Sequence, residues 1–289
     1  MVARRILHLP VWLLAGCAAM LNAEPPAAPA KGAAEGITAV CSRVSKDYVR
    51  SRLPDGSFEP EDYALGKGGR LDGSVRDPSI DDSRFIDIAR AVAGPLAAQN
   101  YLPAKKLDSE KLLIMVYWGT TIVPDPMSRS PAWTGLNNQI DKSTDTQQLG
   151  QLYTDDILRK RIDVKNSELL GYDSDVSLGF GNGGHTGMSR DVHNDELLAE
   201  LEDSRYFVVL LAFDFQAFRT EKKHKLLWET RFSIQEARNL FDKALPVMAQ
   251  RASAYFGRDS HGLVRTKVPE GKVLIGETRS LGEVEAPAK

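Results

Sequence analysis

Two histidines and two aspartates near the middle of the chain have side chains of the kind that hold metal ions. His185 and His193 could supply imidazole nitrogens, and Asp191 and Asp195 could supply carboxylate oxygens. Their spacing matches no standard metal site, and capping of a helix that begins near Asn194 explains the same pattern. A structural role is therefore favoured, and we predict no metal or other cofactor.

A glycine-rich loop before these residues resembles two phosphate-binding motifs. Gly179, Gly181 and Gly184 satisfy G-x-G-x-x-G, and the stretch up to Thr186 nearly mimics a phosphate loop. A dinucleotide loop needs a strand before it and a helix N-terminus after it, so that amide hydrogens converge on phosphate. Neither element is expected here, and His185 stands where a phosphate loop needs lysine. A flexible glycine loop is the preferred interpretation.

Ser260 and His261 have the residue types of a nucleophile and its base. They are adjacent in the sequence, whereas such pairs usually converge from separate elements, and no G-x-S-x-G elbow is present. The polarity of a loop explains both residues. The sequence therefore predicts no catalytic residue here.

Three further groups are explained by folding as well as by chemistry. Paired acids could act as a general acid and base, but Asp81 and Asp82 also suit the N-terminus of a helix. Buried aromatics are more often core than ligand platforms. Lysines at a turn form a solvated tip, with weak attraction to an anionic membrane as the alternative. The acids are Asp72, Asp77, Asp81 and Asp82, the aromatics are Tyr117, Trp118 and Trp228, and the turn lysines are Lys222, Lys223 and Lys225.

The stretch from Tyr206 to Gly257 must position whatever site exists, because its pattern is the most regular in the chain. Alternating apolar residues predict a strand that continues through Phe215, a charged turn at 220–224, and a returning strand with Trp228 on its core face. Ser233 and Glu236 have the spacing of a capping box, which predicts that this strand runs directly into a helix. Pro246 should kink that helix, and Gly257 suits the residue that ends it.

Two more elements are expected before this stretch. Apolar residues at helical spacing predict a helix from Asp82 to Asn100 that contains Pro95. The run from Leu112 to Thr121 is apolar on both faces, which indicates a central strand.

Other segments are less regular. A weak strand is expected within 39–49, and one more strand is expected in the tail, as LVRTKVP or KVLIG. The segment 61–73 is expected to be mostly loop because of its glycines, with a short strand as the alternative. Ile122 to Arg205 is a long insertion with a helix at about 148–170 and a short acidic helix after it. Function is expected on this insertion, because long loops on a regular scaffold commonly carry it.

The first residues predict export. MVARR and ILHLPVWLLAGCAAM have the basic start, the apolar run and the small-residue end of a secretory signal, which is too short to span a bilayer. Leu14 to Cys17 also resembles a bacterial lipobox, which would make Cys17 the site of lipid attachment. Cleavage near Ala23 and an uncleaved apolar tail are the alternatives. The Pro- and Ala-rich segment 24–36 is then a linker.

Composition sets wider limits. With 289 residues, 42% of them hydrophobic, the chain can build one large core or two small ones. The formal net charge of −2 does not favour nucleic-acid binding. Cys17 and Cys41 are the two cysteines, and they cannot form a disulfide framework if Cys17 is cleaved off or modified.

Several segments resemble known proteins of unknown function. LLIMVYWGTT preceded by DIARAVAGPLAAQNY, and YFVVLLAFDF followed by KLLWETRFSI, resemble an uncharacterised family of secreted bacterial proteins over most of the chain after about Val40. The order of helix, strand, strand pair and helix is also similar to small periplasmic lipoprotein domains. The insertion departs from that smaller pattern, and neither resemblance implies an activity or site residues.

The sequence as a whole predicts an α+β protein with a mostly antiparallel sheet, two helices packed on one face, and a long, partly helical insertion. We expect a signal peptide at 1–23, a linker at 24–36, and one domain at 37–289 with its insertion at 122–205. The expected role is a non-enzymatic envelope or secreted protein, periplasmic or tethered through lipidated Cys17, that binds another envelope component and no nucleic acid. An extracytoplasmic hydrolase or metal-dependent enzyme with its site at 173–195 is the alternative.

Overall fold

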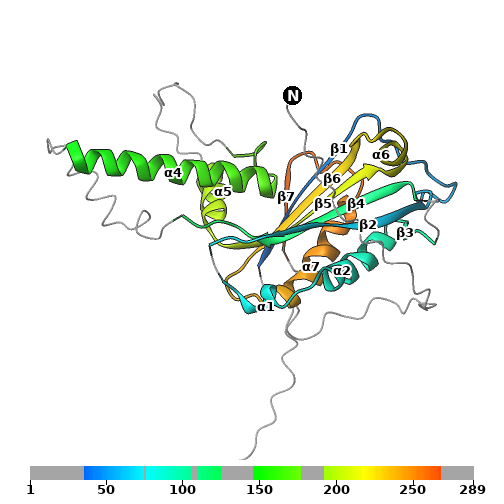
Figure 1. Cartoon of the computed structure of the whole chain (residues 1–289), viewed down its shortest axis with the longest axis horizontal. Helices are drawn as coiled ribbons and strands as arrows, with labels where there is room; N and C mark the ends of the chain where they lie inside the picture. Colours follow the sequence, from blue (N-terminus) through cyan, green and yellow to red (C-terminus); the bar gives the residue numbers. More distant parts are fainter. Residues whose placement is uncertain (1–35, 75, 106–109, 125–145, 177–191, 268–289) are drawn as a thin grey trace, which may run out of the picture.

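A mixed, mostly antiparallel sheet of seven strands forms the centre of the computed structural model, in the order β3-β2-β4-β5-β6-β1-β7 (Figure 1). The structure describes residues 36–74, 76–105, 110–124, 146–176 and 192–267. The β2–β3 and β2–β4 pairs are parallel, and the other strand pairs among the described residues are antiparallel. The predicted α+β class is confirmed. The strands are β1 Ile37–Val44, β2 Glu61–Leu71, β3 Tyr101–Pro103, β4 Leu112–Thr120, β5 Arg205–Asp214, β6 Leu226–Gln235 and β7 Leu263–Lys267.

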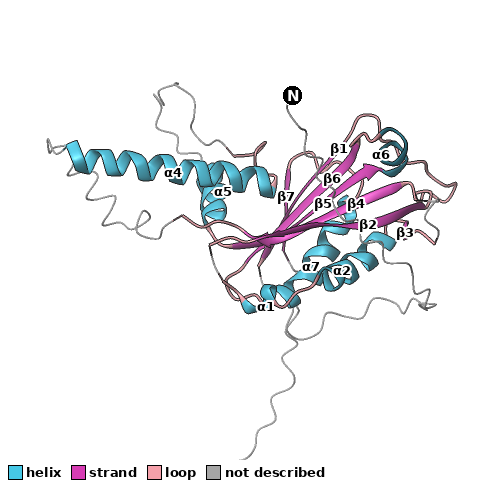
Figure 2. Ribbon diagram, viewed as in Figure 1, coloured by secondary structure: helices cyan, strands magenta, loops and turns pink. Residues whose placement is uncertain are grey.

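Helices lie on both faces of this sheet, as Figure 2 shows. One face is covered by α1, α2 and α7, and an end of the other face is covered by α4 and α5. The helices are α1 Pro78–Asp81, α2 Phe85–Ala97, α4 Thr146–Leu170, α5 Val192–Glu202, α6 Phe215–Glu221 and α7 Phe241–Ala252, which continues into a short 3-10 turn at Ser253–Tyr255.

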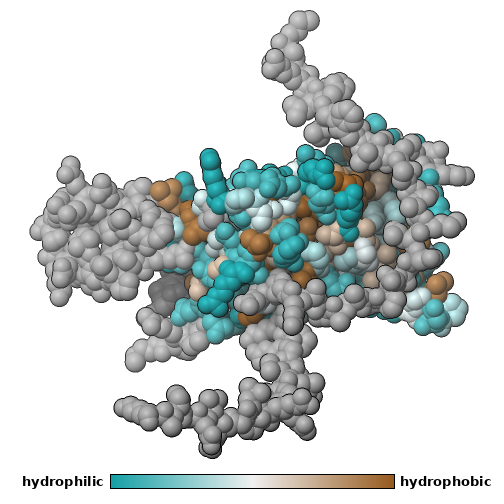
Figure 3. All heavy atoms as spheres, turned by 90° about the horizontal axis from the view of Figure 1, so that it is seen from below, coloured by the Kyte–Doolittle hydropathy of each residue, from teal (hydrophilic) through white to brown (hydrophobic). Residues whose placement is uncertain are grey.

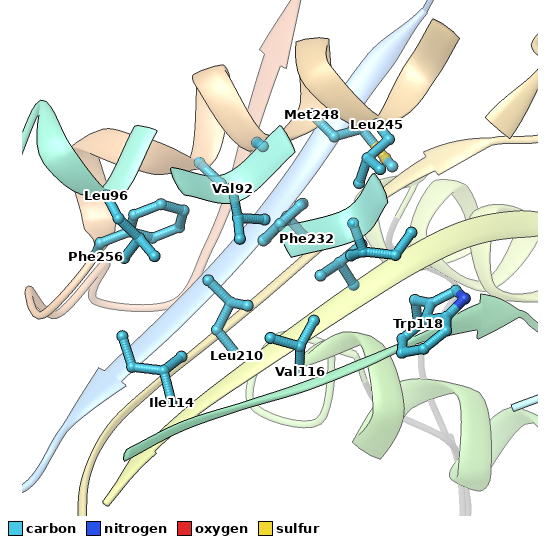
Figure 4. Close-up of a cluster of buried hydrophobic side chains, with 14 of the residues drawn as sticks. Val92, Leu96, Ile114, Val116, Trp118, Leu210, Phe232, Leu245, Met248 and Phe256 are labelled. Carbon is cyan, nitrogen blue, oxygen red and sulfur yellow. The ribbon is translucent and has the colours of Figure 1, made fainter. Parts of the chain in front are cut away.

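The main core lies between the sheet and the α2–α7 pair. Figure 4 shows Val92 and Met248 of the two helices above Val116 and Leu210 of the strands, and all four side chains are fully buried. The apolar stripe of each helix forms because its residues recur at helical spacing. The predicted packing of two helices on one face is therefore confirmed.

A smaller core on the opposite face holds part of the insertion. Leu170 of α4 and Leu197 of α5 pack with Phe207 and Val209 of β5, and Tyr172 is buried among them. Part of the insertion therefore covers one end of this face. The predicted helices at about 148–170 and after Asn194 correspond to α4 and α5.

The prediction for segment 61–73 was wrong. It forms β2, the parallel neighbour of β4, over eleven residues. Glycine weakens strand preference on its own, but a long ladder with β4 outweighs that preference, and a bulge between Lys67 and Gly69 takes up the irregularity. The expected strands near 39–49 and in LVRTKVP are β1 and β7, whereas KVLIG lies outside the described residues.

The end of β5 also differs from the prediction. The strand stops at Asp214, whose carboxylate accepts a hydrogen bond from the Ala217 amide at 3.0 Å and caps α6. The expected charged turn is thus largely a short helix, which Lys222 ends in the left-handed conformation. Side-chain capping therefore overrode the alternation that continued through Phe215.

The predicted helix start at Ser233 was wrong as well. Ser233 stays in β6, where its hydroxyl accepts from the Arg205 guanidinium at 3.1 Å, and Glu236 accepts a hydrogen bond from the Ser204 hydroxyl. Tertiary contacts thus use both side chains, and α7 begins only at Phe241. Gly257 has a φ of +68° after the helical segment, as predicted.

The helix expected from Asp82 starts later than predicted. Asp77 caps α1 instead, accepting from the Ser79 amide at 2.8 Å, and Asp81 and Asp82 lie at the end of α1. The longer helix α2 begins after Arg84, whose backbone amide donates to Asp87 at 3.2 Å. A short capped helix, α1, therefore precedes the longer helix α2, where the sequence predicted a single helix start.

Candidate functional site

The sheet face opposite α2 and α7 is only partly covered by the described residues. Next to the smaller core under α4 and α5, half-buried apolar side chains form a patch on two central strands, and two of them, Tyr117 and Leu211, pack against that core. We call this patch the open strip; it consists of Leu113, Met115 and Tyr117 of β4 and Leu211 and Phe213 of β5. Cross-strand register pairs Leu113 with Phe213 and Met115 with Leu211, so the patch is continuous.

Glycines in β2 give the strip its shape. A Cβ atom at Gly66 would lie 2.3 Å from the Met115 sulfur, and one at Gly68 would lie 2.5 Å from the Tyr117 ring. Both side chains therefore lie across the β2 backbone. Because Gly66 and Gly68 have no side chains, Met115 and Tyr117 can lie along the sheet and do not project from it. These are the same glycines that weakened the strand prediction.

Charged residues border the strip on the β6 side. Arg43 contacts Asp173 at 2.6 Å and Glu229 at 3.7 Å, and Arg231 pairs with the same Glu229. Glu229 and Arg231 lie one residue apart from each other on β6 and pair on this face. Because these charges neutralise one another, the border is polar without a strong net charge.

Aromatic side chains mark the far end of the strip. The His224 ring lies 6.2 Å from Phe213 and 5.2 Å from Phe218 of α6, measured between ring centroids. This contact joins the turn between α6 and β6 to the open face. The predicted lysines lie at the same place: Lys222, Lys223 and Lys225 are exposed.

The site offers apolar contact rather than reaction chemistry. Cys41 lies in β1, next to Arg231 of the border in the ladder, but it is buried, and burial raises the pKa of its thiol above the ordinary value. A thiol in that state is a poor nucleophile at neutral pH. Within the described ranges, no three His, Cys, Asp or Glu side chains gather closely enough to hold a metal ion.

Most of the metal hypothesis lies outside the part that the structure describes. Gly179, Gly181, Gly184, His185 and Asp191 all belong to the segment 177–191. His193 and Asp195 are exposed in the first turn of α5. The enzyme alternative at 173–195 therefore stays a prediction, as does the role of Cys17, which precedes the described residues.

Ser260 and His261 are not arranged as a catalytic pair. The Ser260 hydroxyl accepts from the Ser42 amide at 2.9 Å and donates to the Gly262 carbonyl at 2.6 Å. The His261 side chain is 90% exposed and lies 3.4 Å from Asp259. Ser260 thus fastens the loop after α7 to β1.

Three of the four acids, Asp72, Asp77 and Asp81, are likewise used in folding contacts. Arg70 pairs with Asp72 and with Asp81, and Asp77 accepts hydrogen bonds from Ser79 and from the buried Tyr206 hydroxyl. Trp118 and Trp228 are buried in the main core, whereas Tyr117 belongs to the open strip. Tyr117 also packs, half-buried, against the smaller core under α4 and α5, so the interpretation of the three aromatics as core is confirmed.

One cluster was missed in the sequence. The Arg50 guanidinium lies between the Phe58 ring at 4.3 Å and the Tyr101 ring at 4.1 Å, with Glu61 at 3.8 Å. Tyr48 donates to the same carboxylate, and burial raises the pKa of Tyr101 to about 12. These contacts fix the long β1–β2 connection. Sequence patterning gives no signal for them because the residues come from three separate segments.

Comparison with known proteins does not assign the chain to a family. No model of a known protein family matches the chain, and no curated protein matches it. The resemblance to secreted bacterial proteins therefore stays a prediction. Among the helices that the structure describes, none combines the length and apolar character needed to cross a bilayer.

Proposed function

We propose that this chain is an exported protein of the bacterial envelope, or a secreted one, that works by binding another component. Export is supported by the basic and apolar start of the chain, and Cys17 is the residue that a lipid would modify. Binding is supported by the open strip. No catalytic role is assigned to any residue.

The open strip is the observation that carries the binding proposal. Leu113, Met115 and Tyr117 lie on a central strand, where the surrounding sheet would normally be covered on both faces. Continuous apolar patches on soluble proteins commonly mark interaction sites. The helical side offers a contrast: in Figure 3 its hydrophobic residues are scattered among hydrophilic ones.

Site-specific photocrosslinking tests this proposal. A benzophenone amino acid placed at Met115 of the full chain, produced in the bacterium that encodes it, should give a discrete adduct with one envelope component. The same probe at Arg90, which is 73% exposed on the outer side of α2, is the matched control. An adduct at Met115 that is absent at Arg90 supports the proposal.

Two results would count against it. No adduct at Met115, or the same set of adducts at both positions, would show that the strip has no preferred partner. Size-exclusion chromatography with light scattering separates one further case. A dimer that Met115→Lys dissociates would identify a second copy as the occupant.

A further inference from the structure

A group of exposed lysines lies at the aromatic end of the open strip. Lys222, Lys223 and Lys225 surround His224, and exposed Lys111 is next to them, since its carbonyl accepts from the Phe215 amide at 3.0 Å. We call these four residues the basic turn. They belong to a chain whose formal net charge is −2, so the concentration of positive charge is local.

The acids around the basic turn leave most of this charge uncompensated. Asp214 is engaged as the cap of α6, and Glu221 pairs with Lys223 at 2.7 Å. Glu110 is buried, with one carboxylate oxygen lacking a hydrogen-bond partner among the described atoms. Lys111, Lys222 and Lys225 have no ion pair within the described ranges.

The size of the strip shows that a partner must reach beyond it. From Tyr117 to Leu113 the strip is roughly 13 Å long, and its two strands lie about 5 Å apart, so its area is on the order of 100 Å². A stable interface usually buries about 800 Å² on each partner. The border at Arg43 already satisfies its own charges, whereas the basic turn does not, so the partner gains more by extending over the lysines.

The flatness of the strip favours a protein over a membrane. Insertion into a bilayer needs protruding apolar side chains, but Met115 and Tyr117 lie down across β2 and are only half exposed. A flat apolar face with charge at one end instead suits an amphipathic protein segment.

We propose that the partner binds through a segment with apolar residues over the open strip and Asp or Glu residues over the basic turn. This inference rests on the proposed binding function and adds the chemistry of the partner. Carboxylates would pair with lysines at the rim of the interface, where charge governs association and its salt dependence.

Charge reversal in the full chain tests the inference. The triple variant Lys222→Glu, Lys223→Glu, Lys225→Glu should lower the yield of the Met115 adduct by about tenfold or more, because attraction becomes repulsion. The control reverses three exposed lysines elsewhere, Lys46→Glu, Lys165→Glu and Lys243→Glu, and matches the change in net charge. A benzophenone probe at His224 should capture the same component as the probe at Met115.

The outcomes separate the two proposals. If Met115 captures a component and the triple variant captures it equally well, the acidic partner is overturned while the binding function stands. If His224 gives an adduct but Met115 gives none, the proposed role of the strip fails, and this inference fails with it. Flotation with phosphatidylglycerol vesicles that the triple variant abolishes, without any protein adduct, would overturn both in favour of a lipid surface.

Discussion

At the scale of single residues, positions with unusual backbone conformations or buried polar contacts hold this fold most tightly. Gly257 and Asp77 are examples from opposite ends of the main core. An added side-chain atom at Gly257 would collide with Tyr101, and the Asp77 carboxylate accepts hydrogen bonds from Ser79 and Tyr206. Both therefore give predictions in which the direction of the effect follows from the local geometry.

Gly257→Ala should destabilise the protein by about 3 kcal/mol. The residue has a φ of +68°, and an added Cβ would lie 1.9 Å from the hydroxyl of Tyr101, a buried residue held by Tyr48. Gly56→Ala is the control: its φ of +84° is similar, but nothing lies within 4 Å of the added atom. Urea unfolding measures both, and equal losses would contradict the steric argument.

Asp77 should make stability depend on pH. Burial alone would raise the pKa of its carboxyl, but hydrogen bonds from Ser79 and Tyr206 outweigh burial and hold the pKa below its ordinary value of 3.8. A lowered pKa in the folded state contributes stability that is complete above about pH 4 and is lost as the pH falls through the folded pKa.

Asp77→Asn should therefore reduce the unfolding free energy by about 1–2 kcal/mol at pH 7 and flatten its decline in acid. Denaturant unfolding between pH 2 and pH 7 gives both quantities. Asp47→Asn, at an exposed position, should leave the curve unchanged. If the unfolding free energy of Asp77→Asn falls in acid as steeply as that of the original chain, other groups cause the decline.

At the scale of elements, β2 has an exposed outer edge over much of its length. Its first three residues, Glu61–Tyr63, pair with β3, and no described strand lies along its outer side from Leu65 to Leu71. Exposed edges invite pairing with other chains unless a bulge or charge prevents it. The bulge after Lys67 and the lysine itself fit this protective role.

Lys67→Val should increase self-association at high protein concentration, because a β-branched apolar residue replaces the edge charge. Light scattering of the purified chain detects this. Lys46→Val removes an exposed lysine in the β1–β2 connection and should have little effect. Equal aggregation of the two variants would mean that surface hydrophobicity, and not the edge, is responsible.

Periodicity predicted the regular elements of the scaffold but not the parts set by distant contacts. β4, β5 and the apolar faces of α2 and α7 follow directly from residue spacing. The spacing of Ser233 and Glu236 was misleading because Arg205 and Ser204, far away in sequence, occupy both side chains. Local patterns cannot reveal such competition.

The candidate site was only partly predictable for the same reason. Sequence reasoning put Met115 and Tyr117 on one face of a central strand but expected that face to be buried. In β5 the sequence predicted that the face with Leu211 and Phe213 stays buried to the end of the strand. The structure instead buries the opposite face, which carries Ala212. Which end of a sheet a helix covers depends on where long connections lead the chain. Residue spacing within a strand carries no such information.

At the scale of the whole molecule, the two sheet faces should respond differently to the same substitution. Val116→Lys buries a charge in the main core and should cost several kcal/mol or prevent folding. Met115→Lys places the ammonium on the open strip and should change the unfolding free energy by less than about 1 kcal/mol. Comparable destabilisation of the two variants, measured by urea unfolding, would mean that the strip is core.

The central claim is that a partner covers the open strip in the envelope, and thiol labelling tests it most directly. Met115→Cys should react readily with a maleimide in the purified chain. Native Cys41 should not react, because it is buried. In cells that express the protein, the same cysteine should react several-fold more slowly, while Arg90→Cys reacts equally in both settings. Equal labelling of Met115→Cys in the purified chain and in the cell would contradict the account.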